Sequence, residues 1–344
     1  MVNENATSDG KVTTLTIESA PAAPETATSP ARPQKSRLSS TSSAEKRFRI
    51  VDKIGGISVT IAGFSLIVLT IAIGAFLLYK GSFTFTQFGH TVTEFLFSGT
   101  WEPTDTPDPT ARGSVGAAVF VLGSLMTCFL GLAIATPFSI GAAVFITEIA
   151  PKAGERLFRP AVELFLGIPS VVYGWIGLTV LVPWIRDTLH APMGGYSVLA
   201  AGIVLAVMIF PTITTVAADA ITAVPDNYRE AAYGLGSTRW QSINHIVLPT
   251  AKKGILTGVI LGLARAFGEA LAVAMVIGKT RLFPESILSP TSSLTTAITA
   301  DMGNTTNGGE HNSALWTMAL LLFLISMFFI FVIHMIGAER KKNK

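Results

Sequence analysis

Six long runs of apolar residues constrain this chain more than any other feature. A helix needs about 20 apolar residues to cross the hydrocarbon core of a bilayer, and each run reaches that length. Only 14% of the 344 residues are charged, against roughly 25% in soluble domains. We therefore predict an all-α integral membrane protein with six transmembrane helices. The predicted spans are 54–79, 115–147, 161–184, 196–216, 255–278 and 314–336.

The second run is too long for one simple crossing. Its 33 residues would make a helix of about 50 Å, so it is either one long helix kinked at Pro137 or two short ones. We prefer one helix, because six crossings place 17 near-membrane Lys and Arg residues on one face and 5 on the other. The positive-inside rule makes the richer face cytoplasmic and puts both termini inside.

The domain organisation follows from these spans. Residues 1–45 are rich in Ala, Pro, Ser and Thr and are expected to be a disordered cytoplasmic extension; a regulatory or partner-binding tail is the alternative. Residues 46–114 hold the first span and an external loop, 115–336 the remaining bundle, and 337–344 a basic cytoplasmic tail. A net charge of +3 is too small to argue for nucleic acid. The one cysteine excludes an internal disulfide.

The long inner loop, residues 217–254, carries the most specific pattern. It reads Glu230-Ala231-Ala232, three residues, Gly236, nine residues, and then a segment that contains Ile246, Leu248 and Pro249. Ala231, Ala232 and Leu235 are expected on one helix face, where small side chains let another surface approach closely.

Local signals predict a helix–turn–helix in this loop. Asp226 is a candidate N-cap of the first helix, and Gly236 suits the left-handed position that ends it. Thr238 and Gln241 form a capping-box pattern at the start of the second helix. Pro249 is expected to end that helix.

This pattern resembles the coupling motif of ABC importer permeases of the MetI-like type, and it matches at every fixed position. The resemblance implies that the loop docks into a groove on a separate ATPase. The implied coupling residues are Glu230, Ala231, Ala232, Gly236, Ile246, Leu248 and Pro249, with Glu230 and Gly236 central.

A narrower resemblance covers most of residues 101–336. Segments 123–127, 147–151 and 168–174, together with 265–269 followed by 272–278, resemble phosphate-specific (Pst) permeases. The last pair and the Trp101-Glu102-Pro103 loop are most similar to the PstC subunit. Ala270 and Ala274 depart from that pattern, which has threonines there.

The resemblance implies a permease subunit that forms half of an ATP-driven phosphate import pathway in a bacterial inner membrane, surrounded by lipid. The implied partners are a second permease of the PstA type, two copies of a PstB-type ATPase and an external PstS-type phosphate-binding protein. The chain itself is expected to be no enzyme and to hold no cofactor. Alternatives are a PstA-type subunit, a sulfate or molybdate permease, a secondary anion transporter and a membrane scaffold.

Arg265 and Glu269 lie one helical turn apart, deep in the fifth predicted span. An ionisable residue at that depth usually faces a polar path, and a guanidinium fork matches phosphate oxygens. We interpret both as residues of the substrate pathway, with Glu269 holding Arg265 between transport events. The alternative is a structural ion pair that locks two helices.

Other polar residues point to no chemistry. The segment Gly278-Lys279-Thr280 lacks the first glycine of a phosphate-binding loop, and the five histidines show no ligand spacing, so no metal site is expected. We interpret Glu148, Glu163 and Asp219 as interfacial or helix-packing residues near the inner ends of spans. Helix kinks are expected at Pro169, Pro183 and Pro211.

Overall fold

The computed structural model describes residues 43–104 and 112–342. The chain divides into two compact units, residues 1–63 and 64–344. Helix α1 (Ser43–Thr86) begins in the first unit, and all other described elements belong to the second. The predicted extension 1–45 lies outside the described residues apart from 43–45, where α1 begins.

Five helical segments in the described part of the chain are long and apolar enough to cross a membrane, and they correspond to predicted spans one, two, four, five and six. They run over Asp52–Thr86, Ala118–Ile149, Met193–Thr222, Arg239–Gly268 and Glu310–Val332. The prediction of a helical membrane protein is confirmed, and the described chain adds to its helices only one pair of two-residue strands. The second of these segments consists of α3 (Ala118–Val144) and the π-helical turn η1 (Phe145–Ile149), and the third of η4 (Met193–Gly195) and α8 (Val198–Thr222). The fourth consists of α10 (Arg239–Ser242), the π-helical turn η5 (Ile243–Val247) and α11 (Leu248–Gly268). The fifth lies in α14 (Glu310–Lys342).

The second span is one continuous helix that contains Pro137, which settles the choice between one helix and two. The third span differs from the expected single helix. Its two halves, Pro151–Gly167 and Ser170–Leu189, meet at 92°. The elements are α4 (Pro151–Ala153), η2 (Gly154–Phe158), α5 (Arg159–Gly167), α6 (Ser170–Ile176), η3 (Gly177–Leu181) and α7 (Val182–Leu189).

The bend in the third span has a local cause. Pro169 has no N–H to donate and disfavours helical geometry in the residue before it. Both Ile168 and Pro169 are extended, with ψ of 128° and 139°. The proline that was expected to kink the span therefore breaks it.

The fifth span is also shorter than predicted. Helix α11 ends at Gly268, Glu269 is extended at ψ 126°, and a separate helix α12 (Leu271–Val276) follows. The expected continuous run 255–278 is therefore wrong. The carboxylate of Glu269 accepts a hydrogen bond from the N–H of Ala272 at 3.1 Å. The side chain of Glu269 therefore binds the first turn of α12.

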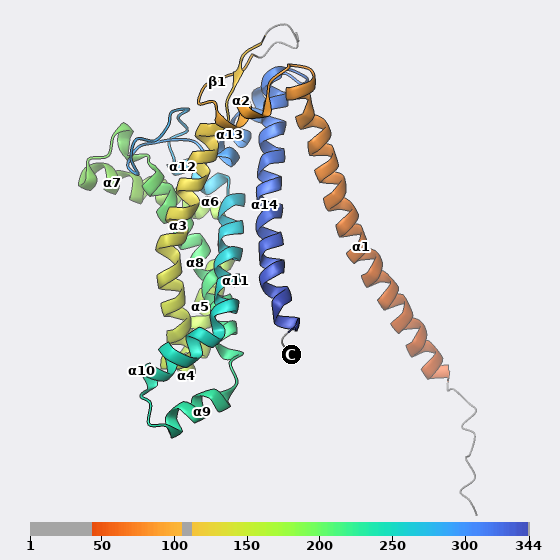
Figure 1. Cartoon of the computed structure of the whole chain (residues 1–344), viewed down its shortest axis with the longest axis vertical. Coiled ribbons are helices and arrows are strands. Elements are labelled where there is room, and N and C mark those ends of the chain that lie inside the picture. Colours follow the sequence, from red (N-terminus) through yellow and green to blue (C-terminus); the bar gives the residue numbers. More distant parts are fainter. Residues whose placement is uncertain (1–42, 105–111, 343–344) are drawn as a thin grey trace, which may run out of the picture. The chain divides into compact units, whose positions relative to one another are not determined.

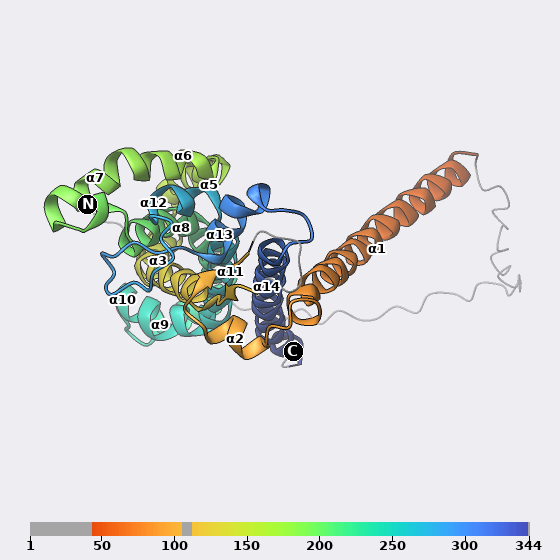
Figure 2. The ribbon, with the colours of Figure 1, turned by 90° about the horizontal axis from the view of Figure 1, so that it is seen from above.

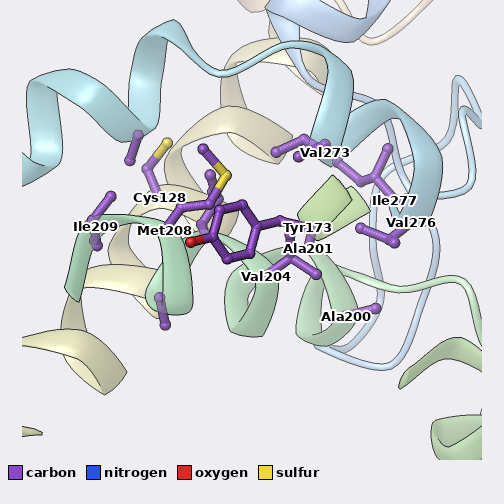
Figure 3. Packing of buried hydrophobic residues seen from close by; sticks show 14 of the residues in the cluster. Cys128, Tyr173, Ala200, Ala201, Val204, Met208, Ile209, Val273, Val276 and Ile277 are labelled. Carbon is purple, nitrogen blue, oxygen red and sulfur yellow. The ribbon is translucent and has the colours of Figure 1, made fainter. Parts of the chain in front are cut away.

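Helix α8 lies at the centre of the second unit. It packs against α3 and α11, and Leu205, Ile209 and Ile213 on one face of it are fully buried. Small residues allow the close packing, because a Cβ on Gly262 would lie 2.6 Å from Ile213. Figure 3 shows the resulting cluster, in which Tyr173 and Val273 pack with side chains of α8. Seen from above, α5, α6 and α7 run along one side of these helices (Figure 2).

The two ends of this unit differ (Figure 1). One end carries the 217–254 loop with α9 (Asp226–Gly234) and α10. The opposite end carries α2 (Val92–Phe97), the antiparallel strands β1 (Trp101–Glu102) and β2 (Ser114–Val115), α13 (Leu294–Asp301) and η6 (Met302–Asn304).

A buried carboxylate holds the strand end together. Glu310 is fully buried, and its Oε2 accepts hydrogen bonds from the N–H groups of Thr104 and Gly113, both at 2.8 Å. His90 Nε2 lies 2.6 Å from the other carboxylate oxygen. The first residue of α14 thus fixes both sides of the β1–β2 connection.

Candidate functional site: the 217–254 loop and the Arg265 segment

The first helix of the 217–254 loop ends as the sequence predicts. Gly236 has φ +82°, a left-handed conformation that favours glycine. The N–H of Gly236 donates to the carbonyl of Tyr233, and the N–H of Ser237 donates to that of Ala232. These two bonds form a Schellman motif. At the other end, Pro225 is the N-cap of α9 and Asp226 its first residue, so the predicted N-cap was one residue late.

The second helix begins at the predicted capping box. The Thr238 hydroxyl accepts from the N–H of Gln241, and the Gln241 side chain accepts from the N–H of Thr238. The expected end at Pro249 is wrong, because Pro249 lies in the first turn of α11. The π-helical turn η5 precedes it, with the N–H of Leu248 donating to Ile243 five residues earlier. Proline is tolerated in this position because it lacks only a backbone N–H, and the N–H groups in the first turn of a helix have no partner within that helix.

The motif residues are divided between solvent and the interior. Glu230, Ala231, Gly236 and Pro249 are exposed. Ala232 is 1% exposed and packs inside the chain, so it does not share an open face with Ala231. The Ile246 and Leu248 side chains are half-buried.

The surface of this loop carries large apolar side chains. Tyr228, Tyr233 and Trp240 are about half exposed or more, and Leu235 is 88% exposed. Tyr228, Tyr233 and Leu235 lie between the candidate spans Met193–Thr222 and Arg239–Gly268, and Trp240 lies at the start of the second of these. Exposed apolar groups gathered on one loop are typical of a surface that meets another protein.

Arg229, next to the motif, joins α9 to the ends of two long helices. Its Nη2 donates to Glu148 Oε1 at 2.7 Å, and its Nη1 donates to the Val224 carbonyl at 2.6 Å. Nη2 also lies 3.1 Å from the Ile221 carbonyl. Arg239 donates to the backbone carbonyl of Glu148. These bonds place Glu148, in the turn η1 that follows α3, among the packing residues, as the sequence predicts.

The predicted ion pair between Arg265 and Glu269 is not present among the described residues. Arg265 Nη1 donates instead to the Thr212 hydroxyl on α8 at 2.9 Å. Glu269 lies beyond the end of α11 and binds α12. The helical spacing that should have aligned the two side chains is lost at Gly268, because the helix ends there.

Arg265 has donor capacity to spare. A guanidinium carries five N–H donors, and the Thr212 bond is its one hydrogen bond within the described chain. The half-buried side chain is therefore able to bind an added oxyanion without breaking an ion pair.

Glu269 faces a small polar cavity. The cavity holds about 10 Å³, room for roughly one water molecule. Its polar lining comes from the hydroxyls of Ser124, Thr127, Ser293 and Thr295 and from Glu269. Thr295 also donates to the Glu269 carbonyl at 2.8 Å, so the break after α11 is held by α13.

Two residues of these sites were not singled out from the sequence. Thr212 stands in an ordinary apolar span, and a hydroxyl there gives no signal of an arginine partner 53 positions away. Arg229 directly precedes Glu230, and its position beside the motif was the available signal.

The comparisons with known proteins agree on one family. A family described as "Binding-protein-dependent transport system inner membrane component" matches residues 135–342. The probable ABC transporter permease protein YqgH of Bacillus subtilis is 46% identical over 299 residues, which are 87% of this chain and 95% of the relative. The phosphate transport system permease protein PstC of Pasteurella multocida is 38% identical over 262 residues, 71% of this chain and 78% of the relative.

A solved structure shows the same fold. A chain in a crystal structure of a bacterial alginate ABC transporter, in complex with an alginate pentasaccharide-bound periplasmic protein, is 18% identical with a TM-score of 0.54. The match covers 84% of this chain and 93% of that one. Family match, relatives and apolar helices together establish a multi-pass bacterial inner-membrane permease, and the chain belongs to the binding-protein-dependent transport system inner membrane component family.

Proposed function

We propose that this chain is the PstC-type permease subunit of an ATP-driven phosphate importer and forms half of its translocation pathway. It pairs with a PstA-type permease, two PstB-type ATPase subunits and a PstS-type external phosphate-binding protein. ATP is hydrolysed in the partner, and this chain supplies the path and the docking loop. Both termini and the 217–254 loop face the cytoplasm, as the distribution of Lys and Arg indicates.

The observation that carries this proposal is the shape of the 217–254 loop. Glu230 and Gly236 are exposed on a short helix that a Schellman motif ends, and Leu235 stands out between them at 88% exposure. A protruding helix with an acidic residue and apolar side chains suits a groove on a soluble partner. We assign the ATPase contact to Glu230, Ala231 and Gly236. The buried side chain of Ala232 instead packs α9 against the rest of the chain.

The substrate class rests on Arg265 and on the relatives. A guanidinium with unused donors, half-buried at the end of α11, suits a tetrahedral oxyanion. Curated relatives named as phosphate transport permeases match over most of the chain, which favours phosphate. Glu269 acts at the edge of this path by fixing the break between α11 and α12.

Sulfate or molybdate is the second candidate substrate. Among the described residues, the one hydrogen bond of the Arg265 side chain goes to the Thr212 hydroxyl, and this bond does not select one oxyanion over another. Competition experiments with the purified importer distinguish the three anions.

The experiment is purification of the tagged chain from its native membrane, followed by mass spectrometry and reconstitution into liposomes. We expect an ATPase and a second permease to co-purify, and ATP-dependent uptake of phosphate that excess sulfate does not inhibit. Uptake that proceeds without ATP, or a chain that isolates with no ATPase, contradicts the proposal. Inhibition by sulfate or molybdate at equal concentration reassigns the substrate.

A further inference from the structure

The Arg229 guanidinium contacts two parts of the chain outside its own helix. Through Nη2 and Nε it binds one oxygen of Glu148, at 2.7 and 3.1 Å, in the turn that follows α3. Through Nη1 and Nη2 it reaches the carbonyls of Val224 and Ile221 at the end of α8. Arg229 itself lies on α9, so one side chain connects α9 with two long helices.

Burial makes this contact different from the other ion pairs at the same end. The side chains of Arg229 and Glu148 are 16% and 9% exposed. The Arg159–Asp219 pair, also 2.7 Å, has side chains 41% and 57% exposed. An exposed pair is screened by water and contributes little, whereas a buried pair is costly to break because the remaining charge loses its partner.

The Arg229 bonds also reinforce a helix end. The Ile221 carbonyl, in the last turn of α8, already accepts from the N–H of Val224, and Arg229 adds a second donor to it at 3.1 Å. A cation placed at the C-terminal end of a helix is also favoured by the helix dipole. Beneath Arg229, the apolar side chains of Val144, Ile221 and Val247 join the ends of α3 and α8 to η5. The end of each helix is therefore bound to the same small cluster.

We propose that the Glu148–Arg229 pair transmits movement of α9 to α3 and α8, and so couples ATP hydrolysis to the substrate path. This inference rests on the proposed function, because it requires that an ATPase moves the 217–254 loop. Arg229 and Glu148 are positioning residues and touch no substrate. Their task is to make the two long helices follow the docking helix.

Helix α8 provides the route to Arg265. Thr212, which binds Arg265, lies on the same helix as Ile221 and about 14 Å along it. Pro211 stands beside Thr212 inside α8, and a proline there removes one hydrogen bond of the helix and permits bending. A displacement of the α8 end by Arg229 is thereby able to alter the Thr212–Arg265 contact.

The test uses the reconstituted importer with its ATPase and loaded binding protein, in three variants: Arg229→Gln, Glu148→Gln and both together. We expect the amount of phosphate carried per ATP hydrolysed to fall about tenfold in Arg229→Gln, within the usual range of coupling between sites. Glu148→Gln keeps the shape and an acceptor oxygen and should lose less. The double variant should lose no more than Arg229→Gln, because the two residues act as one unit.

Arg159→Gln is the matched control, since it removes an exposed ion pair from the same end of the bundle. Its ratio of transport to hydrolysis should equal that of the wild type. Arg229→Lys keeps the charge but not the planar fork, and it should recover part of the ratio. A merely structural role would lower the amount of complex and leave the ratio of transport to hydrolysis unchanged.

The results separate this inference from the proposed function. ATPase that still co-purifies with all variants, together with a lowered ratio, supports the inference. An unchanged ratio in Glu148→Gln and Arg229→Gln, or losses that multiply in the double variant, overturns it while the importer itself stands. Should Arg229→Gln fail to assemble, the ratio in Glu148→Gln decides alone. Wild-type chain that retains no ATPase refutes the proposed function instead.

Discussion

At the scale of single residues, Arg265 is held by a neutral partner. Its bond to the Thr212 hydroxyl orients the guanidinium without cancelling its charge. The expected carboxylate partner, Glu269, binds the N-terminus of α12 instead. A cation kept in place by a hydroxyl stays attractive to an anion, whereas a buried ion pair would have to be broken first.

Substitutions of Arg265 and of Thr212 distinguish two roles for Arg265: binding the transported anion, or joining α8 to α11. Arg265→Ala should abolish phosphate uptake while the complex still assembles, and Arg265→Lys should retain part of it because charge remains without the bidentate fork. Thr212→Val removes the hydroxyl but leaves the cation, so uptake should fall less than in Arg265→Ala. The measurement is uptake normalised to assembled complex. Equal losses in Thr212→Val and Arg265→Ala would mean that the bond serves only to join α8 and α11.

The carboxylate of Glu94, on α2, makes stability depend on pH. Burial alone would raise the pKa of Glu94, but hydrogen bonds from His90 and from the N–H of Thr91, with the positive charges of His90 and Arg112, bring the pKa below its ordinary 4.5. A lowered folded-state pKa stabilises the fold at pH above the unfolded value, and the contribution is lost as pH falls through the folded-state pKa.

Thermal unfolding of the wild type and of Glu94→Gln in detergent tests this linkage. Above pH 4.5 the wild type should unfold at the higher temperature, and the difference should shrink as the pH falls further. Both proteins share every other titrating group, so the difference reports Glu94 together with its interactions with His90 and Arg112. A difference that is the same at neutral and acidic pH contradicts the assignment.

At the scale of elements, signals that lie within a few residues of one another were predictable. The Gly236 turn and the Thr238–Gln241 capping box follow from local chemistry, and both are confirmed. The breaks in spans three and five were not foreseen as breaks. A kink at Pro169 becomes a 92° bend. Helix α11 ends at Gly268, where Glu269 binds the start of α12 and Thr295 binds the Glu269 carbonyl.

The turn at Gly236 offers a paired experiment on the docking helix. Gly236→Pro cannot adopt φ +82° and also removes the N–H that binds Tyr233. It should release the ATPase while the permease still inserts and pairs. Gly234→Ala is the control, because Gly234 is helical and nothing lies within 4 Å of an added Cβ. Recovery of normal amounts of ATPase with Gly236→Pro, together with normal uptake, would refute the docking assignment.

At the scale of the whole molecule, hydropathy locates the apolar spans but does not predict which distant residues meet. Contacts such as Glu148 with Arg229, 81 positions apart, and His90 with Glu310, 220 apart, arise from packing in three dimensions. Although Glu148 was expected to be a packing residue, no local pattern in any of these segments reveals the distant partner. The central position of α8 likewise depends on its contacts with α3 and α11.

Deletion of residues 2–40 should leave the importer working. The deletion removes none of the described helices and keeps Lys46, Arg47, Arg49 and Lys53 beside the first span. Those four charges are enough to maintain orientation by the positive-inside rule. Membrane levels and phosphate uptake of the truncated chain should match the wild type. Normal levels with lost uptake would reveal a required tail.

The buried Glu310 carboxylate gives a practical handle on topology. Because it binds Thr104 on one side and Gly113 on the other, the two ends of the β1–β2 connection are held whatever peptide joins them. A short epitope inserted between residues 105 and 111 should therefore leave transport intact. An antibody against the epitope should label intact spheroplasts or protoplasts, in which the inner membrane is still sealed. Labelling that occurs only after detergent opens the inner membrane would reverse the assigned orientation. Because Glu310 holds both ends of the connection, the inserted epitope reports which side of the membrane this end of the permease faces.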